Sequence, residues 1–181
     1  MTGWCKEYEL YKDDYLNLFD EVMQKEQETN IEFLEKSLSK MLGRNVVACA
    51  NGTDALHFSL ISLGIGKGDE VLTTAFSWIS TASVITMTGA TPVFCDINMA
   101  DYHMSFESIK RMYSDKVKAI IYPHLFGNMS DVGKIKQFCQ EKKIHFIEDA
   151  CQSIGSSYNG VLAGTIGDIS TFSFNANKVI S

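Results

Sequence analysis

Lys178 is the residue near the end of the chain that could do covalent chemistry, and Ser173 lies five residues before it. Only a neutral amine attacks a carbonyl, so Lys178 would act as a Schiff-base nucleophile if its surroundings held it partly deprotonated. The alternative is a solvated charge, because most lysines are exposed. The stretches upstream of Lys178 therefore decide how it is interpreted.

The stretch Asn51-Gly52-Thr53-Asp54 predicts the start of a helix. Gly52 permits a tight turn, and Thr53 is a good N-cap for a helix that begins at Asp54. Free backbone N–H groups and the positive end of the helix dipole would then face one spot and could hold a phosphate. Since the Asp54 carboxylate would repel a phosphate, we expect its N–H to be used and its side chain to turn away. A plain capped helix is the alternative.

Asp149 follows a buried run at the end of an expected strand, and Glu148 alternates to the opposite face. A buried carboxylate needs a cationic partner, and a protonated pyridine nitrogen would be one. Gln152 is placed to reach a substituent of the same ring. The alternatives for Asp149 are a salt bridge or a helix N-cap.

Trp78 lies at an expected strand-to-helix junction, where its ring could lie flat against a planar cofactor. Core packing is the alternative for a single aromatic residue. Taken together, these residues offer a phosphate cradle, a flat aromatic ring, a carboxylate and an amine. That set matches the requirements of pyridoxal 5′-phosphate.

Alternating strands and helices must position these residues. The pattern predicts strands at 46–49, 70–74, 92–97, 118–122, 145–148 and 169–174, and helices at 54–63, 80–87, 106–112 and 132–141, after a helical segment at 1–43. Such alternation is typical of an α/β fold with a three-layer α/β/α arrangement and a largely parallel sheet. Ligands of such sheets collect at the carboxyl ends of the strands, which is where the residues above lie.

Composition narrows the class of protein. The 181 residues suffice for one domain with a core, and the net charge of −6 argues against a nucleic-acid surface. The sequence has no apolar run long enough for a membrane span and no signal-peptide core at its start, so we expect a cytoplasmic protein without membrane contact. The five cysteines are scattered without metal-ligand spacing. We interpret them as reduced core thiols and expect no metal site.

The chain resembles the DegT/DnrJ/EryC1/StrS sugar aminotransferases, which have the type I fold of pyridoxal-phosphate enzymes. The stretches that carry the resemblance are NGTDALHFSLISLGIGKGDEV, FSWISTASVITMTGATPVFCDI, HLFGNMSDV, IEDACQSIGSSYNG and GDISTFSFNANKVIS.

The resemblance implies a role for each residue. Lys178 would form the Schiff base and shuttle the proton, Asp149 would pair with the pyridine nitrogen, and Trp78 would stack on the ring. Gln152 would contact the ring hydroxyl. The phosphate would be held by Gly52, Thr53, the Asp54 backbone and Ser173.

The resemblance also implies a substrate class and partners. We expect an amino group to pass from an amino-acid donor, glutamate, to a keto group of a nucleotide-linked sugar, for amino-sugar or surface-polysaccharide biosynthesis, in a homodimer. The alternatives are a non-catalytic regulatory or binding module and a type I transaminase for another small keto substrate. His57 is interpreted as a packing residue, and His124 could line the site.

By the same resemblance, residues 44–181 would be only part of the cofactor-binding large domain. A further antiparallel strand and a small C-terminal domain would be missing. We therefore expect a gap in the sheet between the 169–174 strand and the 46–49 strand. We also expect that these residues belong to a longer gene product and that alone they are poorly soluble and inactive.

Overall fold

The computed structural model describes residues 3–24, 28–130, 132–175 and 178. The chain forms two compact units, residues 1–48 and 49–181. The first contains helices α1 (Gly3–Gln24) and α2 (Glu28–Leu42), as the sequence predicts for this segment. No helix among the described residues is long and apolar enough to cross a membrane.

The predicted strand at 46–49 is wrong. These residues have no regular structure, and Val47 is 83% exposed. The Val46 N–H donates to Ser39 Oγ at 3.1 Å and the Ala48 N–H donates to Glu35 Oε1 at 2.7 Å, so helix α2 takes donors that a strand would use. The expected gap between two strands therefore does not arise.

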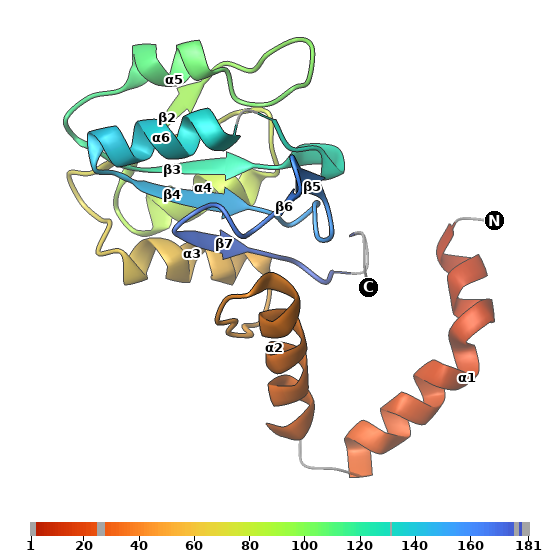
Figure 1. The fold of residues 1–181 in the computed structure, drawn as a ribbon. Helices are drawn as coiled ribbons and strands as arrows, with labels where there is room; N and C mark the ends of the chain where they lie inside the picture. Colours follow the sequence, from red (N-terminus) through yellow and green to blue (C-terminus); the bar gives the residue numbers. More distant parts are fainter. Residues whose placement is uncertain (1–2, 25–27, 131, 176–177, 179–181) are drawn as a thin grey trace. The chain divides into compact units, whose positions relative to one another are not determined.

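The second unit is built on a five-stranded sheet in which every pair of neighbours is parallel. Its order is β2-β1-β3-β4-β7 (Figure 1). The strands are β1 (Glu70–Thr74), β2 (Thr91–Cys95), β3 (Val117–Pro123), β4 (His145–Asp149) and β7 (Ile169–Thr171). The predicted α/β class with a parallel sheet is thereby confirmed.

Strand β7 is shorter than the predicted 169–174 strand. Thr171 is in register with Asp149, the last residue of β4, and the Ala150 N–H still donates to the Thr171 carbonyl at 2.9 Å. Beyond that point β4 has ended, so residues 172–174 have no ladder to join. Within the described part of the chain, β7 is an edge strand of the sheet.

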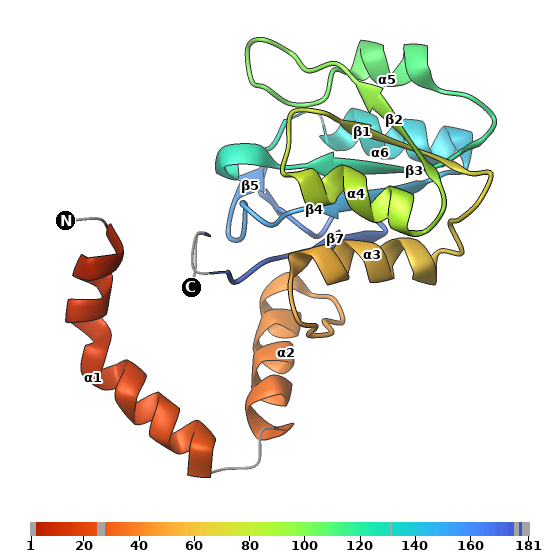
Figure 2. The same ribbon diagram turned by 180° about the vertical axis from the view of Figure 1, so that it is seen from behind.

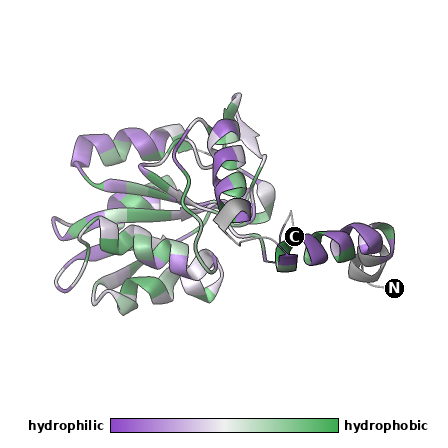
Figure 3. Ribbon diagram, turned by 90° about the horizontal axis from the view of Figure 1, so that it is seen from below, coloured by the Kyte–Doolittle hydropathy of each residue, from purple (hydrophilic) through white to green (hydrophobic). Residues whose placement is uncertain are grey.

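Helices cover both faces of the sheet, which makes the three expected layers. One face carries α5 (Phe106–Met112) and α6 (Val132–Lys142), and the other carries α3 (Gly52–Ser62) and α4 (Ile79–Met87) (Figures 1 and 2). Hydrophobic and hydrophilic residues alternate along these helices (Figure 3).

The alternation of side chains along β3 divides the core into two clusters. Ile120 and Tyr122 belong to the cluster under α5 and α6, whereas Ala119 and Ile121 belong to the cluster under α3 and α4. All four are fully buried, as expected for a central parallel strand. The sheet is thus fixed from both sides, and its carboxyl edge is a rigid platform for the segments that follow the strands.

A short hairpin was not predicted. Strands β5 (Ser157–Tyr158) and β6 (Val161–Leu162) pair antiparallel around Asn159 and Gly160, both of which have positive φ. Asn-Gly is the dipeptide that favours a two-residue hairpin turn, so the signal was present in the sequence.

The cysteines are only partly as expected. Cys95 and Cys139 are buried free thiols, and burial raises the pKa of each to about 12. Cys49 is exposed, so its interpretation as a core thiol is wrong, because the strand that would have buried it does not form. The side chain of Cys5 lies outside the described residues.

Candidate functional site

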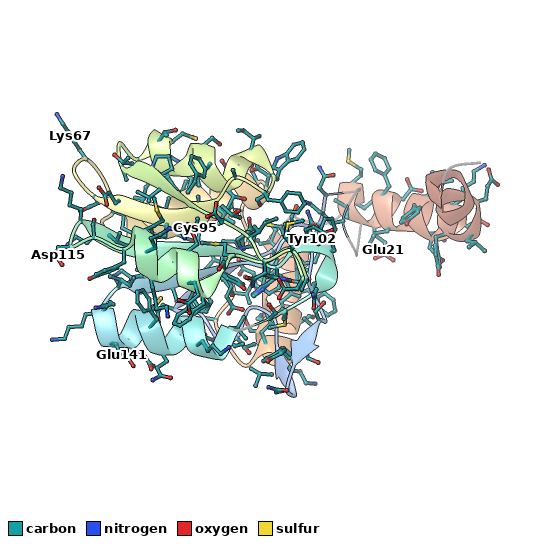
Figure 4. All side chains as sticks on the ribbon, turned by 90° about the horizontal axis from the view of Figure 1, so that it is seen from above. Glu21, Lys67, Cys95, Tyr102, Asp115 and Glu141 are labelled. Atoms are coloured by element: carbon teal, nitrogen blue, oxygen red, sulfur yellow. The ribbon has the colours of Figure 1, made fainter. Side chains whose placement is uncertain are left out.

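A cavity of about 420 Å³ lies at the carboxyl edge of the sheet. It is lined by Asn51, Gly52, Thr53, Leu56, Ser77, Trp78, Ser80, Thr81, Pro123, His124, Leu125, Asp149, Cys151, Gln152, Ser173, Asn175 and Lys178. Every predicted site residue except Asp54 is among them, although they come from four separate parts of the chain. Tyr102 follows β2 and so marks the carboxyl edge of the sheet. Lys67 and Asp115 lie at the opposite edge, away from the cavity (Figure 4).

The first wall of the cavity is the start of α3. Its N-cap is Asn51, whose Oδ1 accepts the Asp54 N–H at 2.9 Å. The predicted N-cap at Thr53 is therefore wrong: asparagine caps at least as well as threonine, and Asn51 lies where its side chain reaches the third helical N–H. Asp54 Oδ2 in turn accepts from Asn51 Nδ2 at 3.0 Å, so its side chain turns away from the cavity as expected.

This cap changes which N–H groups the helix offers. The Asp54 N–H is engaged by Asn51 and is not open to a ligand in this structure. Among the described residues, no acceptor meets the N–H of Gly52 or of Thr53. Those two groups, at the positive end of the helix dipole, are the donors that the cavity presents to an anion.

Gly52 is required by a close approach between segments. A Cβ at this position would lie 2.9 Å from Cys151 Sγ and 3.1 Å from Ser173 Cβ. The absence of a side chain thus lets the helix start pack directly against the segment that follows β7. It brings the free N–H groups of α3 and the Ser173 hydroxyl to the same side of the cavity.

Trp78 precedes α4 and is 69% exposed while lining the cavity. The core-packing alternative for Trp78 is therefore wrong, and its ring has a free face. Next to it, Ser80 Oγ and Thr53 Oγ1 are hydrogen-bonded at 2.8 Å, which ties the starts of α4 and α3 together.

Asp149 ends β4 and is 7% exposed. Its Oδ2 accepts from Thr81 Oγ1 at 2.9 Å, and its Oδ1 accepts the Cys151 N–H at 3.3 Å. Both donors are neutral, and no ion pair to Asp149 exists among the described residues, which leaves the salt-bridge alternative without support. A buried carboxylate in this state is suited to one further, cationic partner from the cavity.

Cys151 lines the cavity as an inert thiol. Burial raises the pKa of Cys151, and the charge of Asp149 and a hydrogen bond to it raise the pKa further, whereas the Thr171 hydrogen bond and the Lys178 charge do not cancel this effect. A thiol held protonated in this way is not a nucleophile. Its role is to fill the space against Gly52.

Gln152 and Lys178 complete the far wall. Gln152 Oε1 accepts the Phe126 N–H at 3.1 Å, which anchors the loop after β3 to the cavity. Lys178 is half-buried, lines the cavity, and has its backbone N–H on the Asn175 carbonyl at 2.7 Å. Among the residues that the structure describes, Lys178 is the one lysine that lines the cavity.

The two histidines differ in position. His124 lines the cavity, and its Nε2 lies 2.8 Å from Glu148 Oε2, on the opposite face of β4 from Asp149. His57 is half-buried in α3, stacks against Phe58 and does not line the cavity, consistent with a packing residue.

Sequence reasoning missed the hydroxyl groups of Ser77, Ser80 and Thr81. All three line the cavity, and they lie within four residues of Trp78 in the sequence. The spacing of four between Ser77 and Thr81 at a helix start would have indicated that they share a face.

A second cavity, of about 540 Å³, lies between α5 and α6 and contains none of the predicted site residues. No group of three His, Cys, Asp or Glu side chains that could hold a metal ion occurs in the described part of the chain.

The residues present fit pyridoxal 5′-phosphate. The two free N–H groups at the start of α3, with Ser173 beside them in the cavity lining, suit a phosphate, and the buried Asp149 suits a protonated ring nitrogen. Trp78 offers an open aromatic face, and Lys178 offers an amine.

The chain matches a known protein family and several of its members. The family model described as "DegT/DnrJ/EryC1/StrS aminotransferase family" matches residues 11–181. The chain is 39% identical over 82% of its length to the GDP-perosamine synthase of Escherichia coli O157:H7 and covers 42% of that protein. It is 35% identical over 98% of its length to a pleiotropic regulatory protein of Geobacillus stearothermophilus and covers 49% of it.

Among solved structures, the chain resembles the PLP-form of the putative sugar aminotransferase Spr1654 from Streptococcus pneumoniae. The TM-score is 0.80 at 30% identity, over 83% of this chain and 43% of that one. The chain thus spans about half the length, or less, of the relatives that it matches.

Proposed function

The chain belongs to the DegT/DnrJ/EryC1/StrS aminotransferase family, and we propose that it is the cofactor-binding part of an enzyme that aminates a keto group of a nucleotide-linked sugar. The amino donor is glutamate, and the whole protein acts as a homodimer in amino-sugar or surface-polysaccharide biosynthesis. One observation carries the proposal: Gly52, Trp78, Asp149 and Lys178, from four separate segments, line one cavity.

Pyridoxal 5′-phosphate, when bound, supplies the electron sink that makes a proton on the carbon bearing the amino group removable. The Gly52 and Thr53 N–H groups and the Ser173 hydroxyl would hold its phosphate. The Asp149 carboxylate would accept a hydrogen bond from the ring N–H and favour the protonated ring nitrogen, because a charge-assisted hydrogen bond is the stronger one. Trp78 would offer its free aromatic face to the ring.

Lys178 has two tasks in the proposal. Its Nζ is the amine that would hold the cofactor covalently, and when free it would act as a general base that takes a proton from the carbon bearing the amino group and later gives it back. Gln152 holds the loop after β3 through the Phe126 N–H, and so keeps that side of the cavity closed.

A regulatory role is the second candidate. It is favoured by the likeness to the pleiotropic regulatory protein, which extends over 98% of the chain. The complete set of Lys178, Asp149 and phosphate-binding groups speaks for catalysis instead, because a purely regulatory module has no need of an amine there. Transamination of another small keto compound differs from the proposal only in substrate.

The test uses the full-length gene product that contains these residues. It is incubated with pyridoxal 5′-phosphate and reduced with borohydride, and the modified peptide is mapped. We expect the label on Lys178 and none after Lys178→Ala, while Lys67→Ala, at the opposite edge of the sheet, is labelled like the wild type. A label on another lysine contradicts the proposed site.

The same protein is then given glutamate and a panel of keto-sugar nucleotides. Formation of an amino-sugar nucleotide, seen by mass spectrometry, is the expected outcome. Cofactor binding without any amino product would favour the regulatory candidate. Amination of a keto compound that carries no nucleotide would favour a transaminase for another small keto substrate.

A further inference from the structure

A chain of two hydroxyl groups ends on the Asp149 carboxylate. Thr81 Oγ1 lies 2.9 Å from Asp149 Oδ2, and Ser77 Oγ lies 2.9 Å from Thr81 Oγ1. Thr81 is 1% exposed and Asp149 is 7% exposed, so water does not compete for the bond between them. Ser77 is half-buried and, like Thr81, lines the cavity.

The direction of these hydrogen bonds follows from proton counting. An ionised carboxylate only accepts, so the single hydroxyl proton of Thr81 points to Asp149. Thr81 has no second proton, and therefore the proton between Ser77 and Thr81 belongs to Ser77. Both hydroxyl dipoles thus point toward the carboxylate and stabilise its charge.

We propose that Thr81, and Ser77 acting through it, are positioning residues for Asp149: they fix the orientation of its carboxylate toward the ring nitrogen. The inference rests on the proposed function. The carboxylate stands at the end of a strand, and its other bond, to the Cys151 N–H, is long at 3.3 Å. The Thr81 hydroxyl therefore makes the shorter of these two hydrogen bonds to the carboxylate.

The position of Thr81 supports a role directed at the site. It belongs to the first turn of α4, 68 positions before Asp149. The N-cap residue of this helix, Trp78, makes no side-chain cap bond, and the Thr81 N–H is already on the Trp78 carbonyl at 3.0 Å. The Thr81 side chain is therefore not used to cap its own helix, and its hydroxyl is available to donate to the Asp149 carboxylate.

The test measures the affinity of full-length protein for pyridoxamine 5′-phosphate, which cannot form a covalent bond with Lys178. Thr81→Val should weaken binding about tenfold to a hundredfold, the range for a hydrogen bond to a charged group. Thr81→Ser should bind within about twofold of the wild type, since it keeps the hydroxyl, and Ser77→Ala should fall between the two.

Thr73→Val is the matched control. Thr73 is fully buried in β1, and its Oγ1 has no hydrogen-bond partner among the described residues, so losing this hydroxyl should leave affinity unchanged. A double-mutant cycle separates positioning from general damage: in the Asp149→Asn background, Thr81→Val should cost much less affinity than it does alone.

Three outcomes would overturn the inference while leaving the proposed function standing. One is wild-type affinity in Thr81→Val, and another is an equal loss from Thr81→Val with and without Asp149→Asn. If Thr81→Val does not fold, wild-type affinity in Ser77→Ala together with a large loss in Thr81→Ser decides against it. Failure of the wild type itself to bind pyridoxamine 5′-phosphate would refute the proposed function, and the inference with it.

Discussion

Glu148 and His124 form a buried pair in which Glu148 Oε2 accepts a hydrogen bond from His124 Nε2 at 2.8 Å, and neither side chain is exposed. Oε2 also accepts the Gly164 N–H at 3.0 Å, and Oε1 accepts the N–H groups of Ile166 and Gly167. The pair therefore holds the loop that leads into β7. It acts on the face of β4 opposite Asp149, and through β7 it sets the position of the segment that carries Lys178.

Glu148→Gln should destabilise the protein strongly. An amide has one acceptor oxygen for four donors, and its NH₂ would face the backbone N–H groups of the loop. We expect the free energy of unfolding in urea to fall by about 3 kcal/mol or more, because each buried donor left without an acceptor costs about 1–3 kcal/mol.

Glu107→Gln is the matched control for this substitution. Glu107 is 78% exposed at its side chain and pairs with Lys110 on the surface, so no measurable change is expected. A Glu148→Gln protein as stable as the wild type would show that the pair is not what holds the loop.

The same pair predicts how stability depends on pH. Burial alone would raise the pKa of Glu148, but the hydrogen bonds from His124 and from the Gly167 and Gly164 N–H groups outweigh it and hold the pKa below its ordinary value of 4.5. The unfolded chain then binds the proton more readily. The contribution is fully present above about pH 4.5 and is lost as pH falls through the lower folded-state pKa.

The measurement is the difference in unfolding free energy between the wild type and Glu148→Gln from pH 7 down to pH 3. Burial alone would raise the pKa of Asp168, but the hydrogen bonds from Lys136 and the Phe146 N–H outweigh burial and lower it. Asp168 titrates in both proteins, so its contribution cancels in the difference. We expect the difference to shrink on the acid side. A difference that stays constant with pH would argue against an ionised, stabilised Glu148.

Gly52→Ala should damage the phosphate-binding wall. The new Cβ would lie 2.9 Å from Cys151 Sγ and 3.1 Å from Ser173 Cβ, and one of the two segments must move. We expect about 1–3 kcal/mol less stability, in line with overpacking, and weaker binding of pyridoxal 5′-phosphate measured by absorbance.

The control for Gly52→Ala is Gly133→Ala in α6, where a Cβ would meet nothing within 4 Å. Because alanine has a higher helix propensity than glycine and Gly133 lies in the first turn of α6, this variant should be unchanged or slightly more stable, by less than about 1 kcal/mol. Equal effects of the two substitutions would mean that the close approach at Gly52 does not matter.

Local patterns predicted most of the sheet. The strand at 70–74 and the helix at 106–112 have the predicted bounds, because buried apolar runs and caps are encoded by neighbouring residues. The segment at 46–49 has the same kind of apolar run, yet it forms no strand. A strand also needs a partner edge, and a run of four residues carries no information about its partner.

The site was predictable to a similar degree. Residues that follow strands, such as Asp149, were found because parallel strands bring their carboxyl ends to one edge. The contact between Thr81 and Asp149 could not be found in that way, since it joins residues 68 positions apart through one side-chain hydroxyl. Asn51 is the N-cap because the helix begins at Gly52. Asparagine and threonine are both good N-caps, so the residue types alone do not decide between Asn51 and Thr53.

Asp149→Asn should leave the fold intact and reduce turnover of the full-length enzyme by about a hundredfold or more, the range for removing one preorganised electrostatic contact. Asparagine keeps the size of the side chain and can still accept from Thr81 Oγ1, but it cannot stabilise a protonated ring nitrogen as a carboxylate does. Asp115→Asn makes the same chemical change on an exposed residue at the opposite edge of the sheet and should keep full activity (Figure 4). The measurements are kcat with glutamate as donor and the thermal midpoint of each variant. Wild-type kcat in Asp149→Asn, with an unchanged midpoint, would make Asp149 a structural carboxylate and would remove the ring-nitrogen contact from the proposed site.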